Sequence, residues 1–531
     1  MGELGYNYTI QRTSARFLSE ENLNAISRFI ELEEESNHDG NLVCGMNGNK
    51  IRIFDSNEIH NLILGDTGSG KTRRELLPYM FSTVSAEESF IVNDTKGDLI
   101  TYILPYVQKK SYKIVILDFK NLKSVDTWNP LFYATELYHA GKKTEAMKMI
   151  KNLYISIFGS LKAEKDPYWE NAAISVCTGA TEFLLENAEP EYVTLQNVMV
   201  VIQDLGKKMQ SYLIEETPVG EVVKNGEVRK LIFNNSKLRA TPMYQRLSIL
   251  YDNAKDTGNC VLSLIRTGLE NFYAYDDVIR FVGTSSFNIE EFGTTPTAVF
   301  LLTSDTQKDM DPLVANFFEQ AYMANVMVAD RIRGRRLPFS LHFIIDEFNS
   351  LTPINDISKK ISTSRSRGIR FTLVVQSYAA LRSVYGDDIA KNIIINCGAW
   401  CIMRSSEYEV HRLVQERLGE VVLPSGKKDW LITIAQLNRL KLGEAIIVYK
   451  GEACFTELPD ISEYKIPIKP LELYEGEEFF HELPKVFNTI SCTHKIIAMR
   501  EGKTVEEMKK EAEKIKENKN SRLPFPMLDD L

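Results

Sequence analysis

One segment constrains the fold more than any other. The apolar run Asn61 to Leu64 leads into Gly65, and Gly70-Lys71-Thr72 follows after four further residues. This spacing matches the GxxxxGK[ST] phosphate loop, which lies between a strand and a helix. Its glycines let backbone N–H groups turn toward an anion, and the helix N-terminus directs its positive dipole end to the same place. The segment therefore predicts a nucleotide-binding loop.

Each residue type in this loop has an expected task. Lys71 is expected to act as a point charge beside the β- and γ-phosphates, and the Thr72 hydroxyl to bind Mg²⁺. The residues expected to surround the phosphates are Gly65, Asp66, Thr67, Gly68, Ser69, Gly70, Lys71 and Thr72. The alternative is a glycine-rich turn that binds nothing, and the complete motif in its strand-to-helix context disfavours it.

Length and composition limit the class of protein. A chain of 531 residues is too long for one core, so two or three domains are expected. The net charge of -9 argues against a broadly basic surface, so any DNA contact should be confined to a channel or patch. Seven cysteines without paired spacing fit a reducing cytosol and offer no zinc site. No apolar run is long enough to span a membrane, which predicts a cytoplasmic chain that touches a membrane only through a partner.

Short runs rich in Ile and Val alternate with helical segments, which predicts an α/β fold with a mostly parallel sheet covered on both faces. From about residue 140 the pattern changes to helical spacing with little alternation, which indicates an inserted all-α domain. The expected parts are a lead-in segment over 1–50, a nucleotide-binding domain over 51–139 and 266–465, an all-α domain over 140–265, and a partly disordered C-terminal extension over 466–531.

A second stretch supports the nucleotide interpretation. Leu341 to Ile345 is an apolar run that ends in Asp346 and Glu347. In a chain that also has a phosphate loop, this is the Walker B pattern. Asp346 is expected to hold Mg²⁺, directly or through water, and Glu347 to polarise the attacking water. The alternative is an exposed strand end, since an apolar run that ends in two acids is common on its own.

The strand predicted over Phe371 to Val375 places Gln376 at the carboxyl edge of the sheet. There its amide could hydrogen-bond the γ-phosphate or the attacking water, or it could instead cap the helix begun by Ser377. Arg365 precedes the same strand and so lies at the opposite edge. It could reach the nucleotide of a neighbouring subunit, or it could belong to a solvated basic loop.

Several motifs in order resemble one family. The chain resembles the TraG/TraD-type coupling proteins of conjugative type IV secretion systems, within the FtsK/HerA class of hexameric motors, over roughly residues 40–465. The motifs that carry the resemblance, besides the two Walker patterns and Gln376, are Asn93 to Leu99 (similar to DPKGEL, with Thr95 where Pro is usual), Trp128 to Leu131 (similar to NPL), Asp166 to Trp169, and Leu442 to Ala445.

The resemblance implies more than the spacing does. It implies a RecA-like P-loop ATPase that uses ATP and Mg²⁺, assembles as a ring of six, and moves relaxase-bound single-stranded DNA toward a secretion channel. The implied partners are DNA, the relaxase and type IV secretion components. Many such proteins begin with membrane-spanning helices, which are not found in this sequence, so we expect either that a membrane protein anchors it at the inner face of the cell membrane or that it works as a soluble member of the family. Arg365 matches the position of a trans-acting arginine.

Two other functions stay open at this point. One is a docking receptor for a relaxase or protein effectors, in which the nucleotide acts only as a switch. The presence of Glu347 argues against it, because binding without hydrolysis needs no base. The other is a DNA pump of the same class that works outside secretion, and no residue distinguishes it.

Overall fold

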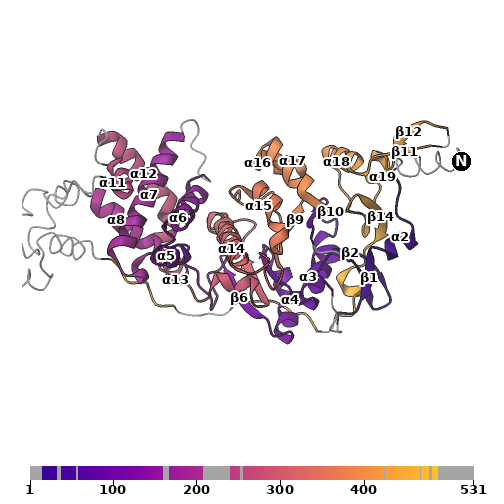
Figure 1. Cartoon of the computed structure of the whole chain (residues 1–531), viewed down its shortest axis with the longest axis horizontal. Coiled ribbons are helices and arrows are strands. Elements are labelled where there is room, and N and C mark those ends of the chain that lie inside the picture. The colour runs from indigo at the N-terminus through magenta and orange to yellow at the C-terminus, as the bar shows by residue number, and fades with distance from the viewer. Residues whose placement is uncertain are drawn as a thin grey trace, which may run out of the picture. The chain divides into compact units, whose positions relative to one another are not determined.

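The computed structural model describes residues 15–32, 38–55, 58–159, 167–206, 240–250, 255–423, 425–466, 468–476 and 481–487 (Figure 1). The chain divides into two compact units. The first, here the sheet unit, comprises Met1–Asp126 and Phe287–Phe479, and the second, the helical unit, comprises Thr127–Ser286 and Phe480–Leu531.

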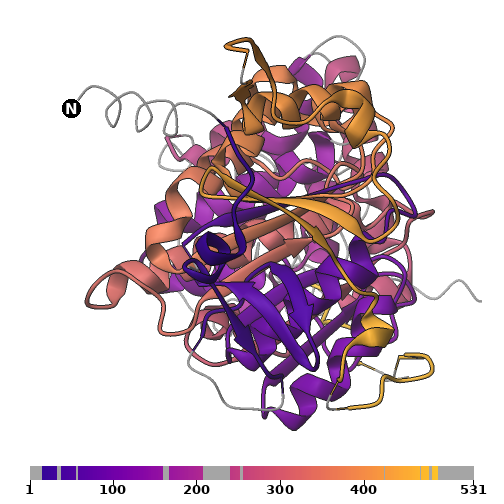
Figure 2. The same cartoon turned by 90° about the vertical axis from the view of Figure 1, so that its right-hand side faces the viewer.

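A nine-stranded sheet with the order β14-β13-β10-β4-β9-β8-β5-β7-β6 organises the sheet unit. Its strands are β4 (His60–Leu64), β5 (Ser89–Asp94), β6 (Lys113–Asp118), β7 (Thr297–Leu302), β8 (Leu341–Ile345), β9 (Ile369–Val375), β10 (Cys397–Ile402), β13 (Glu444–Tyr449) and β14 (Glu452–Glu457). All neighbours from β10 to β6 are parallel, and only β13 and β14 pair antiparallel, at the edge that faces the viewer in Figure 2. The predicted α/β fold with a mostly parallel sheet is confirmed.

Helices and two small sheets complete this unit. The helical segments are α2 (Glu20–Asn24), η1 (Lys71–Leu76), α3 (Leu77–Ser85), α4 (Asp98–Lys109), η4 (Ile289–Gly293), α14 (Asp311–Arg331), α15 (Ile357–Ser364), η5 (Arg365–Arg367), α16 (Tyr378–Tyr385), α17 (Asp387–Asn396), α18 (Tyr408–Leu418), α19 (Ile434–Leu437) and η6 (Ile461–Glu463). The small sheets have the orders β1-β3-β2, made of β1 (Ser27–Ile30), β2 (Val43–Asn47) and β3 (Lys50–Phe54), and β11-β12, made of β11 (Glu420–Val422) and β12 (Lys428–Trp430).

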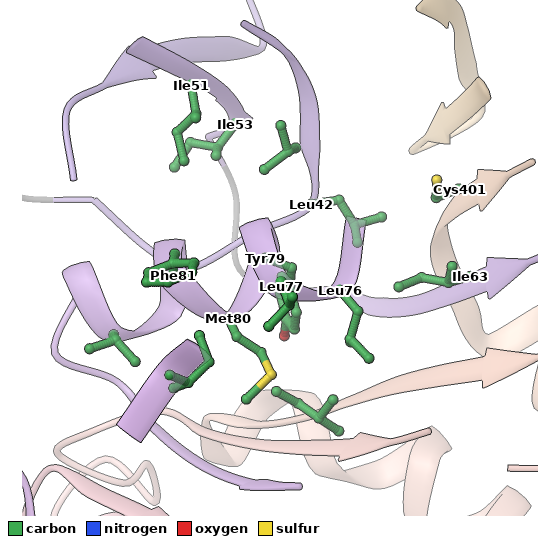
Figure 3. Close-up of a cluster of buried hydrophobic side chains, with 14 of the residues drawn as sticks. Leu42, Ile51, Ile53, Ile63, Leu76, Leu77, Tyr79, Met80, Phe81 and Cys401 are labelled. Atoms are coloured by element: carbon green, nitrogen blue, oxygen red, sulfur yellow. The ribbon is translucent and has the colours of Figure 1, made fainter. Parts of the chain in front are cut away.

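Helix α3, which continues η1 after the phosphate loop, is buried along its whole length. Every residue of α3 is buried, and the buried hydroxyls of Ser82 and Thr83 both donate to the Tyr79 carbonyl. Figure 3 shows Leu77, Tyr79 and Met80 of α3 within one apolar cluster that also includes Ile53 of β3 and Ile63 of β4. The β1-β3-β2 sheet and the nine-stranded sheet thus contribute to the same core around this helix. This shared core holds the helix against β4.

The described part of the helical unit consists of helices: α5 (Phe132–His139), α6 (Lys143–Phe158), α7 (Pro167–Asn187), η3 (Pro190–Tyr192), α8 (Leu195–Gly206), α11 (Pro242–Ser248), α12 (Lys255–Tyr273) and α13 (Asp276–Phe281). The unit is wider than the 140–265 expected from helical spacing. Trp128 N–H donates to the Phe281 carbonyl at 3.1 Å, and Asn129 Nδ2 donates to the Val193 carbonyl at 2.9 Å. These bonds join both flanking segments to the helices.

The expected C-terminal extension, 466–531, has two described parts. In the sheet unit, Leu471 N–H donates to the Thr101 carbonyl at 3.0 Å. In the helical unit, the buried Asn197 amide accepts from Phe487 N–H and donates to the Lys485 carbonyl, both at 2.8 Å. These parts are therefore held by specific bonds. Residues 488–531, on which the expectation of disorder largely rests, lie outside the described residues.

Two buried histidines connect the strands beneath the site. His60 Nδ1 accepts the Phe371 N–H at 3.0 Å, so its Nε2 carries the proton and donates to the Ile361 carbonyl at 2.7 Å. Burial lowers the pKa of His60 to about 3. His342 Nε2 donates to Glu88 at 2.8 Å, and burial also lowers the pKa of His342. Both imidazoles are thus neutral in the folded chain.

Acidification should destabilise the sheet unit. An unfolded histidine with a pKa near 6.5 binds a proton below that pH, whereas the buried His60 ring does not, so lowering the pH from 7 to 5 favours unfolding by about 2 kcal/mol through His60. His60→Gln, whose amide can accept and donate at the same places, should lessen this pH dependence by about that amount. Urea unfolding at both pH values measures it. His139→Gln, at an exposed position in α5, is the control, and an unchanged pH dependence in His60→Gln would contradict the assignment.

Candidate nucleotide-binding site

The sheet brings the predicted groups together at the carboxyl ends of its central strands. The phosphate loop follows β4, Asp346 follows β8, and Gln376 follows β9. Strand β9 lies between the other two and pairs in parallel with both, with Val375 opposite Leu64 and Leu373 opposite Ile345. Because the carboxyl ends of parallel strands face the same way, all three groups meet at the edge where such sheets bind ligands.

The glycines of the loop are required by its backbone. Gly68 and Gly70 have φ values of +76° and +94°, in the left-handed region that side chains disfavour. A Cβ on Gly65 would lie 2.6 Å from the Ser69 hydroxyl, and one on Gly70 would lie 2.8 Å from the Arg74 Cδ. Neighbouring side chains therefore leave no room for a Cβ at Gly65 or Gly70.

Lys71 points into this loop. Its Nζ donates to the carbonyls of Gly65 at 2.6 Å and Asp66 at 2.9 Å. Burial lowers the pKa of Lys71 to about 8, although the charges of Asp346 and Asp66 act in the opposite direction. The Ser69 hydroxyl of the same loop is buried and has no hydrogen-bond partner among the described residues. A partly desolvated ammonium and an unsatisfied hydroxyl inside a glycine loop fit a phosphate group, whose oxygens would accept from both.

Asp66 anchors the tip of the loop to the next strand. Its carboxylate accepts from the Ser405 hydroxyl at 3.0 Å and from the Ser406 N–H and hydroxyl, both at 2.7 Å. Burial acts to raise the pKa of Asp66, but the bonds from Ser406 and Ser405 outweigh it and the pKa is lowered. Sequence reasoning missed the two serines. The available signal was their position just after an apolar run, at the end of β10.

Asp346 is buried at the end of β8 and is held by a neighbouring strand. Its N–H donates to Asn93 Oδ1 at 2.8 Å, and Asn93 Nδ2 donates to its carbonyl at 2.9 Å. Burial, with the adjacent charge of Glu347, raises the pKa of Asp346 to about 6. A carboxylate whose charge is penalised in this way fits a nearby cation. Asp346 and the half-buried Thr72 are thus suited to hold Mg²⁺ with a bound triphosphate.

Glu347 and Gln376 contact each other. Glu347 has a φ of +50°, unusual for a residue with a side chain, and its Oε1 accepts from Gln376 Nε2 at 3.0 Å. Gln376 Oε1 accepts from the Thr67 hydroxyl at 2.9 Å. The helix after Gln376 is capped by the Ser377 side chain, which accepts from Ala380 N–H. The Gln376 amide is thus directed at the site and does not serve as the helix cap.

Arg365 lies at the other end of β9. It begins η5 and is exposed, whereas Arg367 of the same turn pairs with Asp330 at 3.0 Å. Seven residues of strand separate η5 from Gln376, and at about 3.3 Å per residue this separation is on the order of 20 Å. Within one chain Arg365 is therefore not part of the site, as its position before the strand predicted.

Residues far along the chain, between 443 and 460, also hold the helix after the loop. Arg74 Nη1 donates to the Leu458 carbonyl, and Leu458 N–H donates to the Gly443 carbonyl at 2.8 Å. Gly443 has a φ of +94°, and a Cβ there would lie 2.9 Å from Arg74 Nη1. Arg73 Nε donates to Asp460 at 2.9 Å. The Leu442 to Ala445 motif thus supports the phosphate-loop helix.

A glycine pair tests this support. Gly443→Ala and Gly451→Ala would both place a side chain in the left-handed region, but only the first would press on Arg74, since a Cβ on Gly451 would have no described atom within 4 Å apart from its chain neighbours. Gly443→Ala should therefore destabilise the chain by about 1 kcal/mol more than Gly451→Ala, from the disturbed Arg74 bond. It should also speed hydrogen exchange over residues 71–85. Urea unfolding and exchange mass spectrometry measure both effects, and equal behaviour of the two variants would exclude the contact.

The site geometry defines the class of protein. A phosphate loop after one strand, an Asp-Glu pair after a second, and a polar residue after the strand between them are the arrangement of a RecA-like P-loop NTPase. Residues 11–425 match the family model described as Type IV secretory system Conjugative DNA transfer, and the chain belongs to this family. The resemblance drawn from the motifs is thereby confirmed.

Two curated relatives are similar to the chain. Protein VirD4 of Agrobacterium fabrum (strain C58 / ATCC 33970) is 22% identical over 388 residues, which cover 71% of this chain and 52% of the relative. Protein VirD4 of Rhizobium rhizogenes is 22% identical over 372 residues, which cover 68% and 49%. The chain thus spans about half the length of these relatives.

Solved structures show the same fold. The plasmid coupling protein TrwB in complex with the ATP analogue ADPNP matches with a TM-score of 0.57 at 15% identity, over 84% of this chain and 94% of that one. TrwB in complex with ADP and Mg²⁺ matches with a TM-score of 0.57 at 14% identity, with the same coverage. Among the described residues, no helix combines the length and apolar character that a membrane span requires.

Proposed function

We propose that the chain is an ATP-hydrolysing coupling protein that delivers relaxase-bound DNA to a type IV secretion channel. The observation that carries the proposal is the contact of Glu347 with Gln376 at the same sheet edge as the Lys71 loop. A base and a polar side chain beside a phosphate loop suit hydrolysis, because they can activate and orient the attacking water. A protein that only binds nucleotide needs no such base. Family membership supports DNA transfer as the process served.

The residues divide the chemistry among them. The backbone of Gly65 to Thr72 surrounds the β-phosphate, and Lys71 exchanges its bonds to the loop carbonyls for bonds to phosphate oxygens. Thr72 and Asp346 would hold Mg²⁺, which would supply positive charge to neutralise the phosphates. A water oxygen bonds to the γ-phosphorus as the bond from that phosphorus to the bridging oxygen breaks, and the water proton passes to Glu347.

Cargo and partners belong to the same proposal. The family description supports DNA as cargo, with a relaxase and type IV secretion components as partners. The net charge of -9 confines DNA contact to a local patch or channel. We include in the proposal a homohexamer at the inner face of the cell membrane, attached there through a membrane protein.

Two substitutions test hydrolysis. Glu347→Gln should lower ATP turnover by about 100-fold or more and leave ADPNP affinity within a few-fold, because the base is lost while the phosphate loop stays intact. Lys71→Ala should lose turnover and bind ADPNP more weakly. Steady-state turnover with and without single-stranded DNA, across a series of protein concentrations, measures this.

Glu452→Gln, at an exposed position on β14, is the matched control and should behave as the wild type. Nucleotide binding by the wild type without any turnover, with or without DNA, would overturn the proposal. That outcome would favour a nucleotide-switched docking receptor.

An arginine supplied by a neighbouring subunit has a distinct signature. Arg365→Ala keeps its own nucleotide site but offers no arginine to a neighbour, whereas Lys71→Ala offers the arginine but lacks a working site. We expect each variant to be nearly inactive alone and a mixture of the two to regain a measurable fraction of wild-type turnover.

The mixture of Lys71→Ala with Glu347→Gln is the control, because neither variant has a working site of its own. Arg367→Ala removes a guanidinium that pairs within its own chain and should not need complementation. Full activity of Arg365→Ala alone would exclude the trans role.

A further inference from the structure

Three side chains from three separate elements form a continuous hydrogen-bonded chain at the site. Thr67 lies in the phosphate loop, Gln376 follows β9 and Glu347 follows β8. The Thr67 Oγ1 to Gln376 Oε1 distance is 2.9 Å, and the Gln376 Nε2 to Glu347 Oε1 distance is 3.0 Å. The hydrogen-bonded chain thus runs from the phosphate loop to the base, although its ends, Thr67 and Glu347, are 280 positions apart in the sequence.

The chemistry of the groups fixes the direction of every bond. An ionised carboxylate can only accept, so the Gln376 nitrogen must face Glu347. The amide oxygen then faces Thr67 and can only accept, so the Thr67 hydroxyl must be the donor. A residue that could not donate at position 67 would leave nothing at that end to hold the amide in this orientation.

The orientation matters because the Gln376 amide nitrogen has two hydrogens. One is used by Glu347, and the second is left for an attacking water or a γ-phosphate oxygen. The Gln376 backbone is held independently, since its N–H donates to Asn349 Oδ1 at 3.2 Å. Loss of the Thr67 hydroxyl would therefore release only the side-chain amide and would not move the strand end.

We propose that Thr67 is a positioning residue for hydrolysis, which acts on Glu347 through the Gln376 amide. This inference rests on the proposed ATPase function and adds a role for a loop residue beyond contact with phosphate. Thr67 is exposed, so its substitution should leave the fold intact. A role restricted to phosphate binding would instead require that its loss weaken nucleotide affinity.

Two substitutions at Thr67 separate these roles. Thr67→Val keeps the shape of the side chain but cannot donate, and Thr67→Ser keeps the donor. We expect Thr67→Val to lower kcat by about 3- to 10-fold, as loss of one hydrogen bond predicts, with KM for ATP and Kd for ADPNP within about 2-fold of the wild type. Thr67→Ser should stay within about 2-fold of wild-type kcat.

A double-mutant cycle tests whether the effect passes through Gln376. In Gln376→Ala, the further change Thr67→Val should alter kcat by less than about 1.5-fold, because the amide through which Thr67 acts is already absent. Gln376→Glu offers a second background, since a carboxylate at 376 has no donor for Glu347 and Thr67→Val should again add little.

Each outcome decides a different point. Wild-type kcat in Thr67→Val, an equal loss in Thr67→Ser, or the full 3- to 10-fold loss in the Gln376→Ala background would overturn the positioning role. A weakened Kd for ADPNP with unchanged kcat would make Thr67 a phosphate ligand only. Absence of turnover in the wild type would overturn the ATPase proposal itself, and the role of Thr67 with it.

Discussion

The parallel pairing of β9 with both β4 and β8 is the constraint on which the rest of the site depends. It sets the end of the phosphate-loop strand, the end of the acidic strand and Gln376 at one edge. Because the side-chain period of a strand is two, a slip of one residue in either pairing would turn Gln376 or Asp346 to the opposite face. The contacts among Thr67, Gln376 and Glu347 therefore report on this register.

Buried polar contacts below the site fix that register. Arg370, at the start of β9, donates to Glu88 at 2.8 Å, and His342 of β8 donates to the other oxygen of the same carboxylate at 2.8 Å. Burial alone would raise the pKa of Glu88, but Arg370 and His342 outweigh it and bring the pKa to about 2. An apolar layer could slide, whereas a buried carboxylate that loses one of these partners is penalised by several kcal/mol. This network therefore favours one alignment of β8 and β9.

The electrostatics of the site suit an anion beside Lys71 and a cation beside Asp346. Burial lowers the pKa of Lys71 and raises that of Asp346, so both charged forms are less stable than they would be in water. Their mutual attraction compensates only in part. A triphosphate with its metal would supply the opposite charge to each, and so would stabilise the loop in its folded geometry. Arg74 holds the helix after the loop in place through its hydrogen bond to the Leu458 carbonyl. The charge of Lys71 is therefore not needed for that purpose.

Local patterns in the sequence were enough to predict the parts whose chemistry is local. The phosphate loop needs its glycines, Lys71 and Thr72 within a few residues, and an apolar run that ends in Asp346 and Glu347 is likewise a continuous pattern. Runs of Ile and Val determined the parallel sheet, because strands buried on both faces must be apolar throughout. Which distant side chains meet could be seen only in the folded chain. Three sets of hydrogen bonds depend on strand order and register, which no local pattern encodes. They join Asn93 to Asp346, Ser405 and Ser406 to Asp66, and Thr67 to Gln376. The limits of the helical unit also depend on long-range contacts. Hydrogen bonds from Trp128 and Asn129 join the flanking segments to this unit, and helical spacing in the sequence does not reveal such bonds.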